Sequence, residues 1–258
     1  MPRFAANLSM MFTEVPFPAR FEAAARAGFR FVEFLFPYEH TPQDIARWLT
    51  DNNLKNVLFN MPPGDWQAGE RGMSSIPGRE AEFEAGVTRA LEYAEAIGTP
   101  QLHAMAGLLP PGADRHRHRE VYISNLKRAA QTLARHQRTL LIEAINPRDI
   151  PNFFVNHQAD AHALREAIGE PNVKVQMDFY HAQIVDGDLT TLFKRYFDWI
   201  GHVQIAGVPG RNEPDTGEIN YDYLFKMMDD AGYAGYVGCE YRPKGRTEDG
   251  LGWLRAWQ

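Results

Sequence analysis

The sequence predicts a single (β/α)₈ barrel, the α/β fold also called a TIM barrel, over residues 1–258. The chain has 258 residues, and such a barrel typically needs about 250. Eight short β-rich runs alternate with helical patterns from end to end. No Ser/Gly-rich linker or low-complexity tract divides the chain, which favours one domain. A doubly wound open sheet is the alternative for the same alternation.

The expected strands are short runs rich in β-branched and aromatic residues. In chain order they are RFAANL (3–8), FRFVEF (29–34), LKNVLFN (54–60), PQLHAM (100–105), TLLIEA (139–144), VKVQMD (173–178), IGHVQIA (200–206) and GYVGCEY (235–241). Eight such strands, each followed by a helix, are enough to close a parallel barrel.

The helices between these strands carry recognisable start and stop signals. In TPQDIARWL, Thr41 is the expected N-cap and Pro42 occupies the first helical position. GREAEFEAGVTRALEYAEAIG gathers its apolar residues on one helical face and ends at Gly98, a typical helix stop. Strands that alternate with helices of this kind are typical of βα units.

Composition and charge exclude several classes of protein. Hydrophobic residues make up 44% of the chain and charged residues 23%, as in a globular protein with a full core. The net charge of −6 argues against a general nucleic-acid binder. The chain has no apolar run long enough for a membrane span or signal peptide, and its only cysteine, Cys239, fits a reducing compartment. We therefore expect a cytoplasmic protein with neither a membrane nor a nucleic acid as its partner.

Candidate site residues are the polar ones that close each apolar run, because a barrel carries its chemistry at the C-terminal ends of its strands. They are Asn7, Glu33, Asn60, His103, Glu143, Asp178, Gln204 and Glu240. The last four have the sharpest context and lie 35, 26 and 36 residues apart, each about one βα unit. Four successive strands would thus bring three carboxylates and one amide oxygen to one point.

Carboxylates that converge in this way repel one another unless a cation lies among them. We therefore predict a divalent metal bound by Glu143, Asp178, Gln204 and Glu240. The ligand set is all oxygen, which suits Mg²⁺ or Mn²⁺ better than zinc. The alternative interpretation is that each polar group caps a helix or satisfies a loop.

Four further residues are candidates for substrate binding. His181 follows the sixth strand, where its ring could donate to a substrate oxygen or to the neighbouring carboxylate. Arg211 lies in the long loop GVPGRNEPDTGEINY, where it could clamp a substrate carboxylate or pair with Glu213. His103 and Asn7 either line the pocket or are satisfied polar residues of the barrel mouth. The Gly-rich stretch DWQAGERG after the third strand is a candidate lid.

Seven stretches resemble one known family over nearly the whole chain. They are RFAANLSMMFTEVPF, VEFLFPY, MPPGDWQAGERG, HAMAG, LIEAIN, HVQIAGVPGRNEPDTGEINY and GCEYRPKG. Together they are similar to the hydroxypyruvate isomerase family, within the xylose-isomerase-like barrel superfamily. The resemblance implies that the chain interconverts hydroxypyruvate and 2-hydroxy-3-oxopropanoate, or isomerises a related 2-oxo acid such as 2-oxotetronate. It also implies a metal at the four predicted ligands, with Glu143 and Glu240 as acid and base.

The predicted site suits this chemistry without the family. Moving a carbonyl to the next carbon requires removing one proton, returning another, and stabilising the enediolate between them. A chelated metal can act as the Lewis acid, while two carboxylates handle the protons.

Several alternatives stay open at this point. They are a ketose 3-epimerase, a metal-dependent phosphodiesterase such as an apurinic endonuclease, and a non-catalytic sugar-acid binding protein. Epimerases of the superfamily usually have a histidine where this chain has Gln204, which weakens the first alternative. The sequence leaves open the exact 2-oxo acid, the metal, the order of proton transfers and the number of protomers, a homo-oligomer included.

Overall fold

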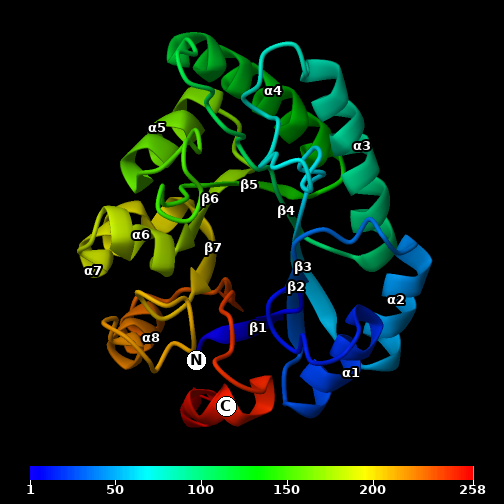
Figure 1. Ribbon diagram of the computed structural model, residues 1–258, viewed down its shortest axis with the longest axis vertical. Helices are drawn as coiled ribbons and strands as arrows, with labels where there is room; N and C mark the ends of the chain where they lie inside the picture. Colours follow the sequence, from blue (N-terminus) through cyan, green and yellow to red (C-terminus); the bar gives the residue numbers. More distant parts are fainter. Residues whose placement is uncertain (258) are drawn as a thin grey trace.

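Eight parallel strands close into a barrel in the computed structural model, which describes residues 1–257 (Figure 1). The strands are β1 (Arg3–Asn7), β2 (Phe31–Phe34), β3 (Lys55–Asn60), β4 (Gln101–His103), β5 (Thr139–Glu143), β6 (Val173–Asp178), β7 (Ile200–Ile205) and β8 (Tyr236–Cys239). Each pairs with its sequence neighbours, and β8 closes the barrel on β1. Every expected strand range contains one of them, so the predicted (β/α)₈ fold is confirmed.

Helices surround the barrel on its outer side (Figure 1). They are α1 (Phe17–Arg26), α2 (Pro42–Asp51), α3 (Glu80–Ile97), α4 (Arg115–Arg135), α5 (Gln158–Ile168), α6 (Phe179–Val185), α7 (Leu189–Tyr196) and α8 (Tyr221–Asp230), with 3₁₀ segments η1 (Phe197–Trp199) and η2 (Thr247–Trp257). The Thr41 side chain accepts from the backbone N–H of Asp44 and caps α2. Gly98 ends α3 in the left-handed conformation. Both end signals in the sequence therefore act as predicted.

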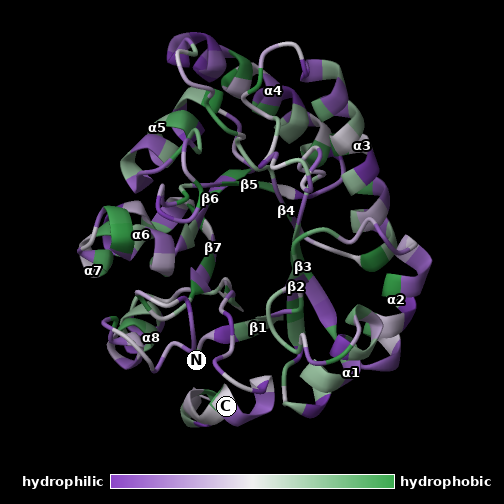
Figure 2. Ribbon diagram, in the orientation of Figure 1, coloured by the Kyte–Doolittle hydropathy of each residue, from purple (hydrophilic) through white to green (hydrophobic). Residues whose placement is uncertain are grey.

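Most of the hydrophobic core lies between the barrel and the helices, so the helices turn hydrophilic residues outward (Figure 2). A second, small cluster consists of Ala5, Val57, Leu58 and Leu141. Side chains two residues apart on a strand share one face. Glu143 therefore lies one layer beyond Leu141, toward the C-terminal end of β5. This register places the polar strand ends above the small apolar cluster inside the barrel.

No helix within residues 1–257 is long and apolar enough to span a membrane.

Candidate active site

A cavity of about 890 Å³ opens at the C-terminal end of the barrel. Asn60, His103 and Glu143 line it from the ends of β3, β4 and β5. His181 and Arg211 enter from the segments after β6 and β7. The cavity therefore lies where a barrel fold is expected to carry its chemistry.

Two buried carboxylates lie close together here: Glu143, which lines the cavity, and Asp178. Glu143 is 5% exposed and Asp178 is fully buried. Glu143 Oε1 and Asp178 Oδ2 have no hydrogen-bond partner among residues 1–257. Both face His181, whose Nε2 lies 4.0 Å from Glu143 Oε1 and 3.5 Å from Asp178 Oδ2. Buried carboxylate oxygens that lack partners are the donors a divalent cation requires, so Glu143 and Asp178, grouped with His181, fit a metal ion. Glu240, another predicted ligand, is not part of this group and is paired with Arg211.

Burial and mutual repulsion raise the pKa values of the three carboxyl groups in this cluster. Burial, reinforced by Glu240 and then Asp178, raises the pKa of Glu143 well above its usual value. Burial raises the pKa of Asp178 to about 6, although Arg211 opposes the rise. Burial also raises the pKa of Glu240 to about 7, again against Arg211. Carboxyl groups that titrate near neutral pH are suited to both accepting and donating protons.

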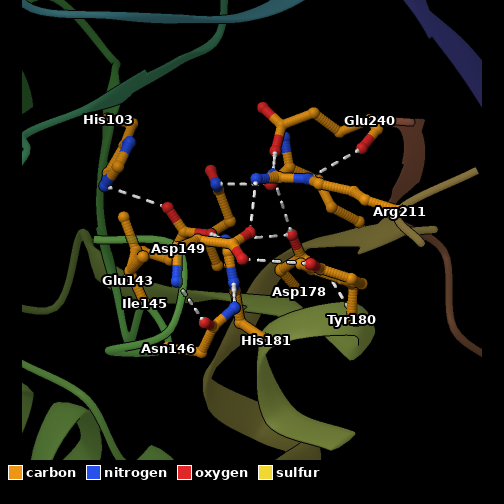
Figure 3. A network of polar contacts seen from close by, with 12 residues as sticks. His103, Glu143, Ile145, Asn146, Asp149, Asp178, Tyr180, His181, Arg211 and Glu240 are labelled. Atoms are coloured by element: carbon orange, nitrogen blue, oxygen red, sulfur yellow. Dashed lines mark hydrogen bonds and ion pairs between the residues drawn. The ribbon is translucent and has the colours of Figure 1, made fainter. Parts of the chain in front are cut away.

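Arg211 binds Glu240 at the edge of the cluster (Figure 3). Its Nη2 donates to Glu240 Oε2 and lies 3.7 Å from Asp178 Oδ2. Its Nη1 contacts Asp149 Oδ2 at 3.3 Å, and its Nε contacts the Glu240 carbonyl at 3.4 Å. All three guanidinium nitrogens thus have acceptors within the protein. Arg211 is paired with Glu240 and Asp149 rather than with Glu213.

Gln204 lies below the cluster with its amide held at both ends. Its Nε2 donates to Glu33 Oε1 at 2.8 Å, and its Oε1 accepts from Gln176 Nε2 at 2.7 Å. The bond to Glu33 orients the amide so that the oxygen faces Gln176, beside Asp178 on the neighbouring strand. An amide oxygen has two lone pairs, so one of them stays available to a cation.

His181 is set up as a hydrogen-bond donor. The backbone N–H of Asp149 donates to Asn146 Oδ1 at 2.8 Å, which turns the Asn146 amide nitrogen toward His181 Nδ1 at 2.6 Å. Nδ1 therefore accepts, and the proton of the neutral ring is on Nε2. Burial keeps the ring neutral by lowering its pKa well below the usual value. His181 Nε2–H thus points at the carboxylate cluster and suits a substrate oxygen better than a metal.

His103 has the opposite arrangement. Its Nδ1 lies 3.2 Å from Asn60 Oδ1, so Nδ1 donates and Nε2 has a free lone pair. Nε2 lies 3.7 Å from Glu143 Oε2 and has no hydrogen-bond partner among the described residues. Burial lowers the pKa of His103 to about 3 and keeps the ring neutral. Together the two histidines offer one donor and one acceptor to the cavity.

A buried polar floor, formed by Asn7, Glu33, His202 and Gln204, lies beneath the site. Glu33 is 1% exposed and accepts from Asn7 at 3.0 Å, His202 at 2.7 Å and Gln204 at 2.8 Å. Asn7 also donates to Glu240 Oε1 at 3.2 Å. Hydrogen bonds of this kind offset the cost of burying a carboxylate. They connect Glu33 to a predicted metal ligand, Gln204, and to a predicted acid or base, Glu240.

The polar floor depends on the absence of a side chain at Gly238. A Cβ at this position would lie 2.3–2.5 Å from the Glu33 carboxylate, which three hydrogen bonds hold in place. We expect Gly238→Ala to lower the free energy of unfolding by about 1–3 kcal/mol, as overpacked cores do. Urea unfolding against Gly245→Ala, where a Cβ would meet nothing within 4 Å, measures the difference. Equal unfolding midpoints for the two variants would mean that Glu33 moves freely.

The structure thus brings the eight predicted site residues to one end of the barrel. Glu143, Glu240, His103, His181 and Arg211 line the cavity, Asp178 is fully buried next to His181 and Arg211, and Gln204 and Asn7 bind the Glu33 carboxylate. Sequence reasoning missed Gln176, Asn146 and Asp149, whose role is to orient or neutralise these residues. Gln176 stands two residues before Asp178 on the same strand face, which is a signal that could have revealed it.

Comparison with known proteins identifies the family. Residues 21–257 match the model of the xylose isomerase-like TIM barrel. The chain belongs to this family. A 2-oxo-tetronate isomerase of Cupriavidus necator is 55% identical, over 100% of this chain and 99% of its own. The Escherichia coli hydroxypyruvate isomerase is 47% identical, over 98% of each chain. These relatives confirm the predicted hydroxypyruvate isomerase resemblance and the prediction of an isomerase.

A solved structure extends the comparison to the fold. The crystal structure from Brucella melitensis described as "AP endonuclease, family 2" is 54% identical, covers 100% of both chains and has a TM-score of 0.99. A TM-score this high over the whole chain means that this protein has the complete barrel described above.

Proposed function

We propose that this family member is a metal-dependent isomerase of a small 2-oxo acid, acting on 2-oxotetronate or on hydroxypyruvate. The observation that carries the proposal is the convergence of buried carboxylates, two of whose oxygens lack partners, on one cavity. The two relatives, named as a 2-oxo-tetronate isomerase and a hydroxypyruvate isomerase, support the same substrate class.

In this proposal Glu143 and Glu240 move the two protons. One carboxylate removes a proton from C3 of the 2-oxo acid, and the other supplies a proton to C2. The O3 hydroxyl proton moves to O2, so the carbonyl shifts from C2 to C3. The negative charge of the enediolate intermediate lies on the oxygens bound to C2 and C3. The pKa of Glu240, raised to about 7, matches this task, because a general acid or base works best when it titrates near the working pH. Burial also raises the pKa of Glu143.

Glu143, Asp178, Gln204 and Glu240 are the proposed ligands of a Mg²⁺ or Mn²⁺ ion. When bound, the ion would supply Lewis-acid stabilisation for the charge that develops on the substrate oxygens. His181 would donate a hydrogen bond from Nε2–H to one of these oxygens. His103 Nε2 would accept a hydrogen bond from a substrate hydroxyl group. Asn7 and Arg211 would hold Glu240 and face the substrate from below and from the side.

We also propose that residues 1–258 act as one domain in the cytoplasm. Every described strand belongs to the same closed barrel, which supports a single domain. The only cysteine, Cys239, is buried and free, and burial raises the pKa of its thiol well above the usual value. A thiol of this kind is compatible with a reducing compartment.

Metal analysis followed by NMR of turnover on a panel of C3 to C6 oxo acids and ketoses tests the function. We expect turnover of hydroxypyruvate and 2-oxotetronate, with little on C6 ketoses. Faster 3-epimerisation of C6 ketoses would instead support the ketose epimerase alternative. Cleavage of DNA at abasic sites by the same preparation, without turnover of any acid, would support the endonuclease.

A further inference from the structure

The carboxylate of a 2-oxo acid substrate requires a cationic side chain as its partner. That side chain must not already be paired with the buried carboxylates of the site. A substrate anion that approaches Glu143, Asp178 and Glu240 meets like charges, which disfavour binding. Arg211, the sequence-based candidate for this partner, already has acceptors for all three of its nitrogens. A second cation in the same cavity would therefore be needed.

Arg71 lines the cavity from the loop between β3 and α3. Its Nη1 donates to the Trp66 carbonyl at 3.2 Å and to the Glu70 carbonyl at 2.7 Å. Its guanidinium lies over the Trp66 ring, 3.9 Å from the centroid. The neighbouring acid, Glu70, is itself paired with Arg79. Among residues 1–257, no carboxylate lies within ion-pair distance of Arg71 and no acceptor contacts its Nε or Nη2.

The contacts of Arg71 select which edge of its guanidinium stays available. Two carbonyls use both N–H groups of Nη1, so the Nε–Nη2 edge carries the remaining donors. Two parallel N–H groups on such an edge match the two oxygens of a carboxylate. The ring of Trp66, which packs on Phe36 at 5.0 Å between centroids, limits the rotation of the guanidinium. Arg71 is therefore pre-organised to bind one carboxylate side-on.

Directly after Arg71, its loop is attached to the segment that follows β4. Gly72 donates to the Pro63 carbonyl at 2.8 Å and forms a bridge with Ala106 in the segment after β4. A Cβ at Gly72 would lie 2.2–2.6 Å from Met105, so the two segments are in close contact here. Ser74 Oγ also donates to the Met105 carbonyl at 2.8 Å. These contacts hold the C-terminal end of the loop, next to Arg71, against the segment after β4.

We propose that Arg71 binds the carboxylate of the substrate through its Nε–Nη2 edge and thereby selects 2-oxo acids over neutral ketoses. The inference rests on the proposed function for its substrate class. Arg211 then serves as the counter-ion of Glu240, and Arg71 sets the orientation in which C2 and C3 reach the two glutamates.

Hydroxypyruvate and dihydroxyacetone form a matched pair of substrates, because they differ only in a carboxylate against a CH₂OH group. We expect Arg71→Met to raise KM for hydroxypyruvate about 10- to 100-fold, as expected for a lost charge-assisted pair. The kcat/KM for dihydroxyacetone should change less than about twofold. Arg71→Lys, which keeps the charge but loses the paired donors, should lie between Arg71→Met and the parent protein.

Arg115→Met is the control for loss of a stacked arginine. Arg115 lies over the Phe154 ring at 4.9 Å and donates to the Phe154 carbonyl, outside the cavity. Its substitution should leave the preference between the two substrates unchanged. If Arg71→Met slows both substrates equally, or neither, the inference is overturned.

A binding measurement separates this inference from the proposed function. Glycerate and glycerol also differ only in a carboxylate against a CH₂OH group, and neither can be isomerised. Calorimetry with and without Mn²⁺ therefore measures their affinity without turnover. The parent protein should bind glycerate more tightly than glycerol, and Arg71→Met should lose that difference. This result would support the carboxylate site even if no oxo acid is turned over. Equal affinity of the parent protein for both ligands would overturn the inference, whatever the turnover experiments give.

Discussion

We expect Glu143→Gln and Glu240→Gln each to lower the rate of isomerisation by about 10²- to 10⁴-fold, the usual contribution of a general acid or base. Glutamine keeps the shape and an oxygen ligand but has no titratable group. The metal content should therefore stay close to that of the parent protein while the proton transfers fail. Turnover of hydroxypyruvate followed by NMR, with metal analysis of each variant, measures both quantities.

Hydrogen exchange in D₂O then assigns the two glutamates to the two carbons. The glutamate that removes the C3 proton can label the starting material even when the second transfer is blocked. One variant should still exchange the C3 hydrogen of hydroxypyruvate without forming product, and the other should not. Glu218→Gln, whose carboxylate contacts Gln183 on the exposed surface, is the control. Parent rates in both site variants, with metal retained, would leave Glu143 as a structural ligand only.

We expect removal of divalent metal by a chelator to abolish isomerisation, and Mg²⁺ or Mn²⁺ to restore it. Without a cation, Glu143 and Asp178 lie buried next to each other with oxygens that lack hydrogen-bond partners, and the proposed Lewis acid is missing. The free energy of unfolding should also rise with ion concentration, because the ion binds only the folded site. Activity assays after dialysis and thermal unfolding with added Mn²⁺ measure the two effects. Full activity in protein shown to be metal-free would contradict the metal site.

The sequence predicts the fold well because each barrel strand can be recognised from its own residues. A run such as TLLIEA is short, apolar and β-rich, and its last polar residue marks the end of β5. The same strand-end pattern predicts Glu143, Asp178, Gln204 and Glu240 at one end of the barrel, because the C-terminal ends of parallel strands lie at the same end. Local patterns of this kind are sufficient for both the architecture and the main candidates.

The remaining parts of the site depend on contacts between distant segments. Glu33 and His202 are 169 positions apart in the chain, yet they share a hydrogen bond of 2.7 Å. The proton position on His181 follows from the orientation of Asn146, which depends in turn on the Asp149 backbone. Arg71 looks like an ordinary loop arginine until its Nη1 contacts are known. None of these features leaves a periodic signal in the sequence.

The polar floor beneath the site constrains how this barrel can evolve. Asn7, His202 and Gln204 all donate to Glu33. Replacing Glu33 alone with an apolar residue would therefore leave these three buried donors without an acceptor. Each donor, replaced alone, leaves part of a buried carboxylate unsatisfied. Such sites show epistasis, because the effect of one substitution depends on the others. We expect random mutagenesis to change this layer only through combined substitutions, and any apolar replacement that stabilises the barrel to do so at the expense of turnover.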